Sequence, residues 1–409
     1  MIEMKEFHLD IPVEPPKELE SLFLPIPREY VEDTYKKDEF LVLVGPQHPG
    51  SGHMRLIVRV KGDIIQEVIP DPGYVHRCVE KIAENRLYIQ NIPLVERPSI
   101  MDSANFNLGY VRAIEAAMDI EVPERAKFIR TILAELCRIG THLYDAAILA
   151  VFIGHTTGFM YPFGIRELIC ESLVRMTGAR FTSSFIVPGG VRRDVDEKTL
   201  RWVYDATFAI EKRLKSFERI FIKNPTVIAR LRDVGVLSKE EAIKFGVVGP
   251  FLRASGVEYD TRVVEPYEAY EELTWDIVTA DEGDGYARFM VRVNEVSQSL
   301  SIIRQCITSM PDGSYISEQI GEVRGNFFDK FADIVLPAGE YTTLTEAARG
   351  TLLFTIVSDG ESNVPYRMRI VSPGWLYLRG FMEALKGERL ADLQAIYGSF
   401  GYFPPEADR

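Results

Sequence analysis

The sequence predicts an α+β protein, with a large central helical bundle and small antiparallel sheets near both ends of the chain. Apolar residues alternate with a period of two over residues 40–70, and they recur with helical spacing from residue 73 onward. Strand-like runs return within residues 336–409. With 409 residues, 46% of them hydrophobic, the chain is long enough to bury a sizeable core.

Changes of pattern along the chain predict five segments. They are an extended N-terminal arm (1–39), a small antiparallel β region (40–72), a helical core (73–245), a mixed loop and helix region (246–335), and a C-terminal β region with a tail inserted toward the site (336–409). The arm is charged and contains several prolines, which disfavour regular structure. No internal repeat or low-complexity tract alters this division.

The β region rests on three apolar runs, FLVLV, MRLIVRV and DIIQEVI. Turn residues, including Gly62, separate the second run from the third, so we expect an antiparallel sheet. Near the other end of the chain, TLLFTIVSDG and YRMRIVSPG predict further strands.

The helical core rests on amphipathic patterns. A helix expected over residues 122–154 has Pro123 at a likely first position and Glu124 in its first turn, as helix N-termini favour. Further helices are expected over residues 74–92, 103–120, 163–178, 200–222 and 286–310.

Composition excludes several functions. The formal net charge of -13 argues against nucleic acid, whose phosphates require a basic surface. Four scattered cysteines form no C-x-x-C pair, fit no zinc or iron–sulfur pattern, and suit a reduced, cytoplasmic setting. The N-terminus lacks the apolar stretch of a signal peptide, and the longest apolar run, Ala146–Gly154, is too short to cross a bilayer. We therefore expect any membrane connection to come through partner subunits.

Seven stretches of the chain carry a family resemblance. They are GPQHPGSGHMRL, GYVHRCVEKIAENRLYIQNI, AELCRIGTHL, FGIRELICESLVRMTGARF, PGGVRRD, LRASGVEYD and TEAARGTLLFTIVSDG. In this order they resemble the large subunits of respiratory complex I and of membrane-bound nickel–iron hydrogenases. The resemblance covers almost the whole chain and implies the nickel–iron hydrogenase large-subunit fold. VPERAKFIRTILAELCRI and ARLRDVGVLSKEEAIKFGVVGPFLRASG look most like the archaeal membrane-bound branch, which includes a sulfane-sulfur reductase.

The hydrogenases of this family hold nickel and iron with two C-x-x-C motifs, because soft thiolates suit that centre. Here Ser99 and Asp102 stand at the early motif, and Phe403 and Glu406 stand at the late one. The resemblance therefore implies no metal site and no hydrogenase activity. Glu406-x-x-Arg409 resembles the charged pair that replaces the last C-x-x-C in the reductase relatives.

Two histidines, His48 and His53, lie on one Gly/Pro-rich loop. Histidines that only hydrogen-bond a hairpin turn are one interpretation. The resemblance implies another, a loop that borders the acceptor cavity, where an imidazole donates a proton to the acceptor. It likewise implies that Tyr88 hydrogen-bonds the acceptor, although a half-buried helix tyrosine is the simpler interpretation.

Asp102 and Glu406 are expected to share a buried pocket, because the lost thiolates converged there. Arg97 and Arg409 are the cations expected beside them. Buried ion pairs would explain the set structurally, and a proton relay is the alternative.

A stripe formed by Glu135, Arg138 and His142 marks an otherwise apolar helix, so it must be paired internally or face a partner. The resemblance places Arg77 and His142 against an iron–sulfur cluster of a neighbouring subunit. A cation there would favour cluster reduction, and a histidine would couple electron uptake to proton uptake.

Further along the chain, Thr156 is expected at the position of an aspartate that partners a loop histidine in complex I, which counts against quinone chemistry of that type. Glu346 and Arg349 are expected as ion-pair partners near the cavity, or as an ordinary pair at a strand edge.

The resemblance implies a peripheral-arm electron-transfer subunit of an ion-translocating oxidoreductase on the cytoplasmic side of the membrane. The chain is expected to bind no redox cofactor itself and to adjoin a four-iron, four-sulfur cluster in a small iron–sulfur subunit. Other hydrophilic-arm subunits and a membrane arm with antiporter-like subunits are the further partners. Ferredoxin-dependent reduction of sulfane or polysulfide sulfur is the favoured activity. Quinone reduction and a non-catalytic coupling scaffold are the alternatives.

Overall fold

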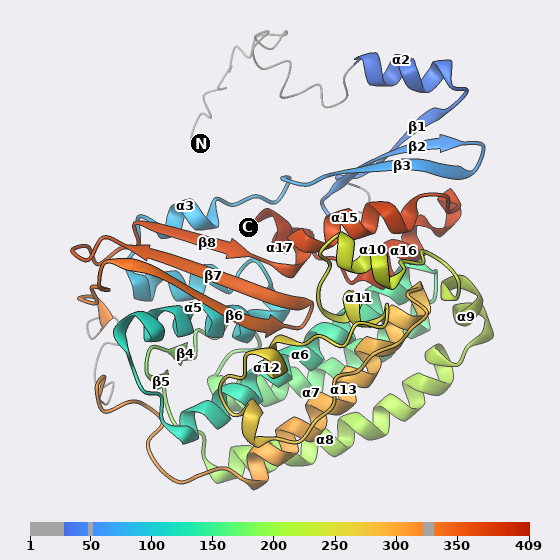
Figure 1. Ribbon diagram of the computed structural model, residues 1–409. Helices are drawn as coiled ribbons and strands as arrows, with labels where there is room; N and C mark the ends of the chain where they lie inside the picture. The colour runs from blue at the N-terminus through green and yellow to red at the C-terminus, as the bar shows by residue number, and fades with distance from the viewer. Residues whose placement is uncertain (1–27, 48–51, 322–330) are drawn as a thin grey trace, which may run out of the picture.

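The computed structural model describes residues 28–47, 52–321 and 331–409 (Figure 1). A three-stranded sheet near each end of the chain flanks a body of long helices, so the α+β prediction is confirmed. The C-terminus lies between the C-terminal sheet and helix α15 (Pro373–Leu385) (Figure 1), and the helix that precedes it is largely buried. This arrangement brings the last residues of the chain to the middle of the fold.

The N-terminal sheet has the order β1-β2-β3 and is antiparallel. Its strands are Phe40–Val44, Arg55–Lys61 and Ile64–Asp71, as the three apolar runs predict. Helix α2 (Arg28–Lys36) precedes it, so the end of the arm is helical where an extended chain was expected. The rest of the arm, residues 1–27, lies outside the described residues.

Five long helices make the body: α5 (Ser103–Met118), α6 (Glu124–Phe152), α7 (Thr156–Thr177), α8 (Glu197–Phe217) and α13 (Gly285–Thr308). Helix α6 is buried along most of its length and packs against α5, α7, α13 and α16. Polar side chains on α6 are therefore held inside the protein, where they need partners. This helix positions most of the site described below.

The helix expected over residues 74–92 is broken into short pieces. They are α3 (Val79–Ala83), the 3₁₀ turn η2 (Tyr88–Asn91) and α4 (Ile92–Val95). Cys78, just before α3, has a left-handed backbone with φ 54°, which a continuous helix does not allow. The helical periodicity was correct locally, but it did not reveal these breaks.

The C-terminal sheet has the order β6-β7-β8. Strand β6 (Gly339–Ala347) was not expected, whereas β7 (Gly350–Ser358) and β8 (Arg367–Val371) match the predicted runs. The chain then forms α15, α16 (Leu393–Phe400) and α17 (Pro404–Asp408). Helix α17 is largely buried, which places Glu406 inside the fold.

Shorter elements connect these parts. They are η3 (Ile100–Asp102), β4 (Ile186–Val187), β5 (Gly190–Val191), the π-helical turn η4 (Glu218–Ile222), α9 (Pro225–Leu231), α10 (Lys239–Lys244), α11 (Gly249–Arg253), α12 (Thr261–Val264), η5 (Tyr270–Glu272) and η6 (Leu390–Asp392). Within the described ranges, no helix has the length and apolar character needed to cross a bilayer.

Candidate active site around Arg349

Arg349, in the turn between β6 and β7, joins distant parts of the chain. Its guanidinium donates to Asp145 Oδ1 at 2.6 Å and to Glu406 Oε1 at 3.0 Å. Its Nε donates to the carbonyl oxygen of Gly401 at 2.6 Å, and its guanidinium carbon lies 5.3 Å from the centre of the Phe403 ring. One buried cation therefore bridges two buried carboxylates, a combination that is stable only while the cation is present.

Asp102 lies on the other side of the same turn. Its carboxylate accepts from the backbone N–H of Ala348 at 2.6 Å and from the side-chain amide of Asn105 at 2.6 Å. Burial raises the pKa of Asp102 to about 7; Arg138 opposes this rise and the Glu406 charge adds to it. Asp102 and Glu406 therefore share one buried region, as expected for residues at the positions of the lost thiolates.

The cations expected beside these carboxylates need correction. The Arg97 side chain is 42% exposed, and its nearest acidic partner is Glu96 at 3.9 Å. Arg409 has a left-handed backbone with φ 55°, which turns it out of α17, and it lies 3.5 Å from Glu80. Arg349 is the cation of Glu406 instead. The sequence placed Arg349 near the cavity but did not identify its partners.

A cavity of about 360 Å³ adjoins this ion-pair group. His53, Tyr144 and Asp145 bring polar groups to its wall. The other large side chains of the wall are apolar or aromatic: Ile148, Val151, Phe152, Tyr397, Tyr402, Phe403, Pro404 and Pro405. An apolar hollow with a few convergent polar groups is the usual form of a small-molecule site.

Asp145 is the carboxylate that sequence reasoning missed. It comes from α6, one turn after His142, and its Oδ2 is buried without a hydrogen-bond partner among the described residues. A side chain at Gly401, where φ is 62°, would approach this oxygen to 2.6 Å, so glycine is needed there. Thr156 begins α7 and is exposed, and the carboxylate that shares the cavity wall with His53 is that of Asp145.

The loop histidines are partly described. His53 is exposed, has a left-handed backbone with φ 75°, and lines the cavity. His48 lies outside the described residues. The acceptor role of both remains a prediction, and the geometry places His53 where that role requires it.

More than half of the chain matches one known protein family. Residues 153–409 match the family described as the 49 kDa subunit of respiratory-chain NADH dehydrogenase. The chain belongs to this family. It is 37% identical over 400 residues to a subunit of the NADH-quinone oxidoreductase of Thermodesulfovibrio yellowstonii, and the match covers 93% of this chain and 98% of that protein.

Two further relatives agree with this assignment. A subunit of the NADH-quinone oxidoreductase of Geotalea uraniireducens is 37% identical over 381 residues, covering 90% of this chain and 97% of that protein. A chain in the structure of an archaeal membrane-bound sulfane sulfur reductase superposes with a TM-score of 0.85 and 34% identity. That match covers 91% of this chain and 99% of the other. This 49 kDa-family chain is therefore one subunit of a multisubunit, complex-I-like oxidoreductase, and the predicted family and fold type are confirmed.

Tyr88 of the 49 kDa-family chain lies away from this cavity. Its side chain is buried, and its nearest charged and polar neighbours include Ser358 and Asp359 at the far end of β7 from Arg349. Eight residues of strand separate Gly350 from Ser358, which is roughly 26 Å at strand spacing. The structure therefore does not bring Tyr88 together with His53 or Glu406.

The polar stripe of α6 is paired internally. His142 Nε2 lies 2.8 Å from Glu295 Oε2 on α13, and Arg253 donates to the same carboxylate at 2.9 Å. Glu135 lies 3.2 Å from Arg138 and accepts from Tyr270 at 2.6 Å.

Burial lowers the pKa of His142, and Glu295 opposes this fall. Its Nδ1 is buried without a hydrogen-bond partner in the described part of the chain. The imidazole is therefore held inside the fold by Glu295.

Arg77 is exposed and lies apart from this stripe. Its guanidinium donates to the carbonyl oxygen of Arg97 at 2.8 Å, and its backbone N–H donates to that of Arg409 at 3.1 Å. Across the described ranges, no hydrogen bond or ion pair joins Arg77 to His142. The two residues expected at the partner's cluster thus differ in setting: Arg77 is available at the surface, and His142 is enclosed.

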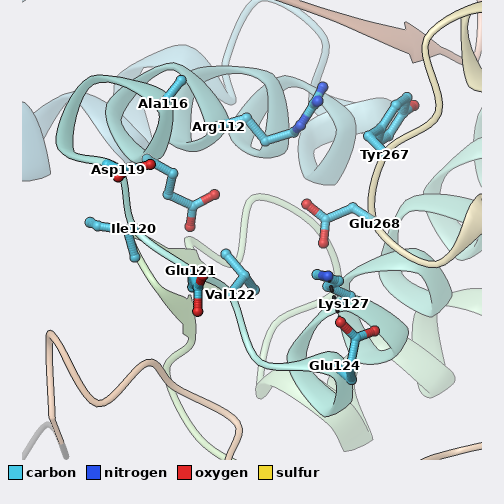
Figure 2. A pocket seen from close by; sticks show the side chains of 11 residues that line it. Arg112, Ala116, Asp119, Ile120, Glu121, Val122, Glu124, Lys127, Tyr267 and Glu268 are labelled. Carbon is cyan, nitrogen blue, oxygen red and sulfur yellow. Dashed lines mark hydrogen bonds and ion pairs between the residues drawn. The ribbon is translucent and has the colours of Figure 1, made fainter.

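A second hollow, of about 590 Å³, lies near the C-terminal end of α5 and has a mainly charged wall (Figure 2). Arg130 donates to Glu115 at 2.5 Å beneath it and lies 3.2 Å from Glu268. Figure 2 shows the Glu268 carboxylate pointing into the hollow, with Arg112 above it. Most of its wall is charged, and sequence reasoning had assigned none of its residues to a functional site.

Proposed function

We propose that this chain forms the acceptor-reducing cavity of a membrane-bound, complex-I-like oxidoreductase and that the acceptor is a quinone. The observation that carries the proposal is the aromatic cavity with His53, Tyr144 and Asp145 on its wall. Aromatic and proline side chains suit an uncharged ring, and the polar groups suit its oxygens. Desolvating a polysulfide anion against this mainly apolar wall is costly, so the wall favours the uncharged acceptor.

Asp145 also supplies the negative charge whose expected absence at Thr156 counted against quinone chemistry. It lies on the same cavity wall as His53, so a carboxylate and an imidazole can act on one bound acceptor. Arg349 holds the Asp145 carboxylate in place through a 2.6 Å hydrogen bond. We propose that His53 donates a proton to the acceptor and that Asp145 stabilises the charged imidazole.

Sulfane or polysulfide sulfur is the second candidate acceptor. The TM-score of 0.85 to a chain of the sulfane sulfur reductase complex favours it. A quinone is uncharged and a polysulfide is an anion, so assays with each acceptor distinguish the two candidates. A scaffold that only transmits cluster reduction to membrane subunits is the third possibility, and it requires no acceptor in the cavity.

We propose that the chain holds no redox cofactor and that a four-iron, four-sulfur cluster lies in a neighbouring small iron–sulfur subunit. Such a cluster needs four thiolates at one place. The four cysteines here are Cys78, which is exposed, and Cys137, Cys170 and Cys306, which are buried and come from three different helices. Arg77 at the surface is the residue we propose to face the cluster, with His142 behind it.

We propose equally that the chain is not a hydrogenase. Side chains that cannot supply thiolates, those of Ser99, Asp102, Phe403 and Glu406, stand at the four ligand positions. Ser99 and Glu406 are instead hydrogen-bonded to Arg349, at 3.3 Å and 3.0 Å. Nickel in the purified complex, measured by elemental analysis, would contradict this part of the proposal.

Reduced ferredoxin is the donor we propose, with electrons entering through other hydrophilic-arm subunits. We further propose that the complex sits on the cytoplasmic side of the membrane and that its membrane arm, with antiporter-like subunits, moves ions. These assignments rest on the family resemblance, because their contacts belong to other subunits.

The deciding experiment assays the purified intact complex with reduced ferredoxin and either a short-chain quinone or polysulfide. Faster quinone reduction, lost in His53→Ala with assembly preserved, is the expected result. Polysulfide reduction without quinone reduction would transfer the assignment to the second candidate. Reduction of neither acceptor, with the cluster still reducible by ferredoxin, would favour the scaffold.

A further inference from the structure

Tyr144 occupies a position on the cavity wall that no expectation had assigned. It precedes Asp145 on α6, is partly buried, and lines the cavity beside it. Its ring packs against Phe163 and Phe403, with centres 6.2 Å and 6.3 Å away. These aromatic contacts hold the ring in one place, as a residue that orients a bound molecule requires.

The Tyr144 hydroxyl is free to meet a ligand. In the described part of the chain no hydrogen bond involves it, and it is not among the buried polar atoms left without a partner. Tyr402 differs, because its hydroxyl is buried within the wall. Among the tyrosines of the cavity, Tyr144 therefore offers a phenol that remains accessible.

Two buried cations lie close enough to act on the Tyr144 phenol. Burial raises the pKa of Tyr144, while Arg349 and Arg166 both oppose that rise and Asp145 adds to it. The phenol is therefore protonated at neutral pH, and the two cations stabilise the phenolate that remains when its proton leaves.

Arg166 is unusual because no carboxylate within the described ranges forms an ion pair with it. Its guanidinium lies over Phe181 at 4.6 Å and Phe163 at 5.6 Å, and it donates to the sulfur of Met101 at 2.9 Å. Its Nε is buried and finds no hydrogen-bond partner among the residues that the structure describes. The positive charge is thus not neutralised locally, and it acts on Tyr144.

We propose that Tyr144 is a catalytic acid of this cavity, donating its phenolic proton to an oxygen of the bound acceptor. The inference rests on the proposed function, since it names a residue that acts on the acceptor of the same cavity. It assigns to Tyr144, which lies on the cavity wall, the interaction with the acceptor that the family resemblance implied for Tyr88.

With a quinone as acceptor, atoms and electrons balance. Two electrons arrive one at a time from a reduced iron–sulfur cluster of the partner subunit, and the quinone is reduced to the quinol. The O–H bond of Tyr144 breaks while a new O–H bond forms on one quinone oxygen, and the second oxygen takes its proton from the His53 imidazolium, whose N–H bond breaks. Protons from solvent then restore the Tyr144 phenol and the His53 imidazolium, so neither residue is oxidised or consumed.

The test compares Tyr144→Phe with the wild type in the intact complex, using a short-chain quinone. Phenylalanine keeps the ring contacts and removes only the hydroxyl. Tyr204→Phe is the matched control, because Tyr204 is also partly buried and packs against Phe208 at 5.3 Å, but it lies on α8 outside the cavity. Electron paramagnetic resonance of the reduced cluster verifies that electrons still arrive.

We expect kcat to fall about a hundredfold in Tyr144→Phe while KM stays within about twofold, because the lost interaction acts in the proton-transfer step. Arg166→Gln should lower kcat by a smaller factor, again without raising KM. Unchanged kcat in both variants, or a rise in KM alone, would overturn the assignment. A wild-type complex that reduces no quinone overturns the proposed function as well, whereas wild-type activity retained in Tyr144→Phe overturns only this inference.

Discussion

Arg349 and Arg130 present the same arrangement in two regions of the molecule: one buried guanidinium between two carboxylates. Arg349 holds Asp145 and Glu406 at 2.6 Å and 3.0 Å, and Arg130 holds Glu115 and lies 3.2 Å from Glu268. Each pair adjoins a hollow, but the first hollow is aromatic and the second is charged. The ion pairs alone therefore do not define an active site; the wall beside them decides what can bind.

Removing either arginine should have the largest effect on stability, and the loss should be similar in the two regions. Arg349→Met leaves Glu406 buried without its cation and Asp145 with only Arg292, 3.8 Å away, whereas Arg130→Met leaves Glu115 and Glu268 without theirs. We expect the free energy of unfolding to fall by about 3–5 kcal/mol in each variant, measured by urea denaturation of the purified chain. Unchanged stability in either variant would mean that its carboxylates are protonated in the folded state.

Neutralising one carboxylate in each region should show which of the two hollows takes part in catalysis. Asp145→Asn and Glu115→Gln both weaken a buried ion pair, so both lower stability to a similar degree. Only Asp145→Asn should slow quinone reduction, by about ten- to a hundredfold per assembled complex, because only Asp145 lines the aromatic cavity. Equal turnover in the two variants would remove Asp145 from the chemistry.

The last prediction concerns pH and the Arg349 region. The pKa of Asp102 is about 7 in the folded chain, against an ordinary value of 3.8, so the folded state binds more protons between these values. Stability from this group is therefore fully present below about pH 4, falls as pH rises toward 7, and is constant above. Asp102→Asn should flatten this fall in urea midpoints measured from pH 4 to pH 8. A slope equal to that of the wild type would show that another group titrates there.

Local pattern was sufficient for much of this molecule. The apolar alternation of residues 40–70 produced the strands of the N-terminal sheet, and the helix expected over 122–154 is α6. The positions left by the lost thiolates correctly predicted that Asp102 and Glu406 lie in one buried region. These successes depend on residue spacing or on the order of family motifs.

The rest depended on contacts between distant residues, which spacing does not reveal. Asp145 and Arg349 are 204 residues apart in the chain, and only the packed fold shows that they form an ion pair. The left-handed backbone at Cys78 broke a helix whose periodicity was sound. Tyr88 carried a motif match, but the strand that it adjoins places it far from the cavity.

The buried polar group beside the aromatic cavity is assembled from residues 102, 145, 349 and 406, so no single stretch of the chain contains it. A partly folded molecule would display neither the carboxylate nor the phenol in usable form. If the proposed function holds, the acceptor can therefore be reduced only by the fully folded chain.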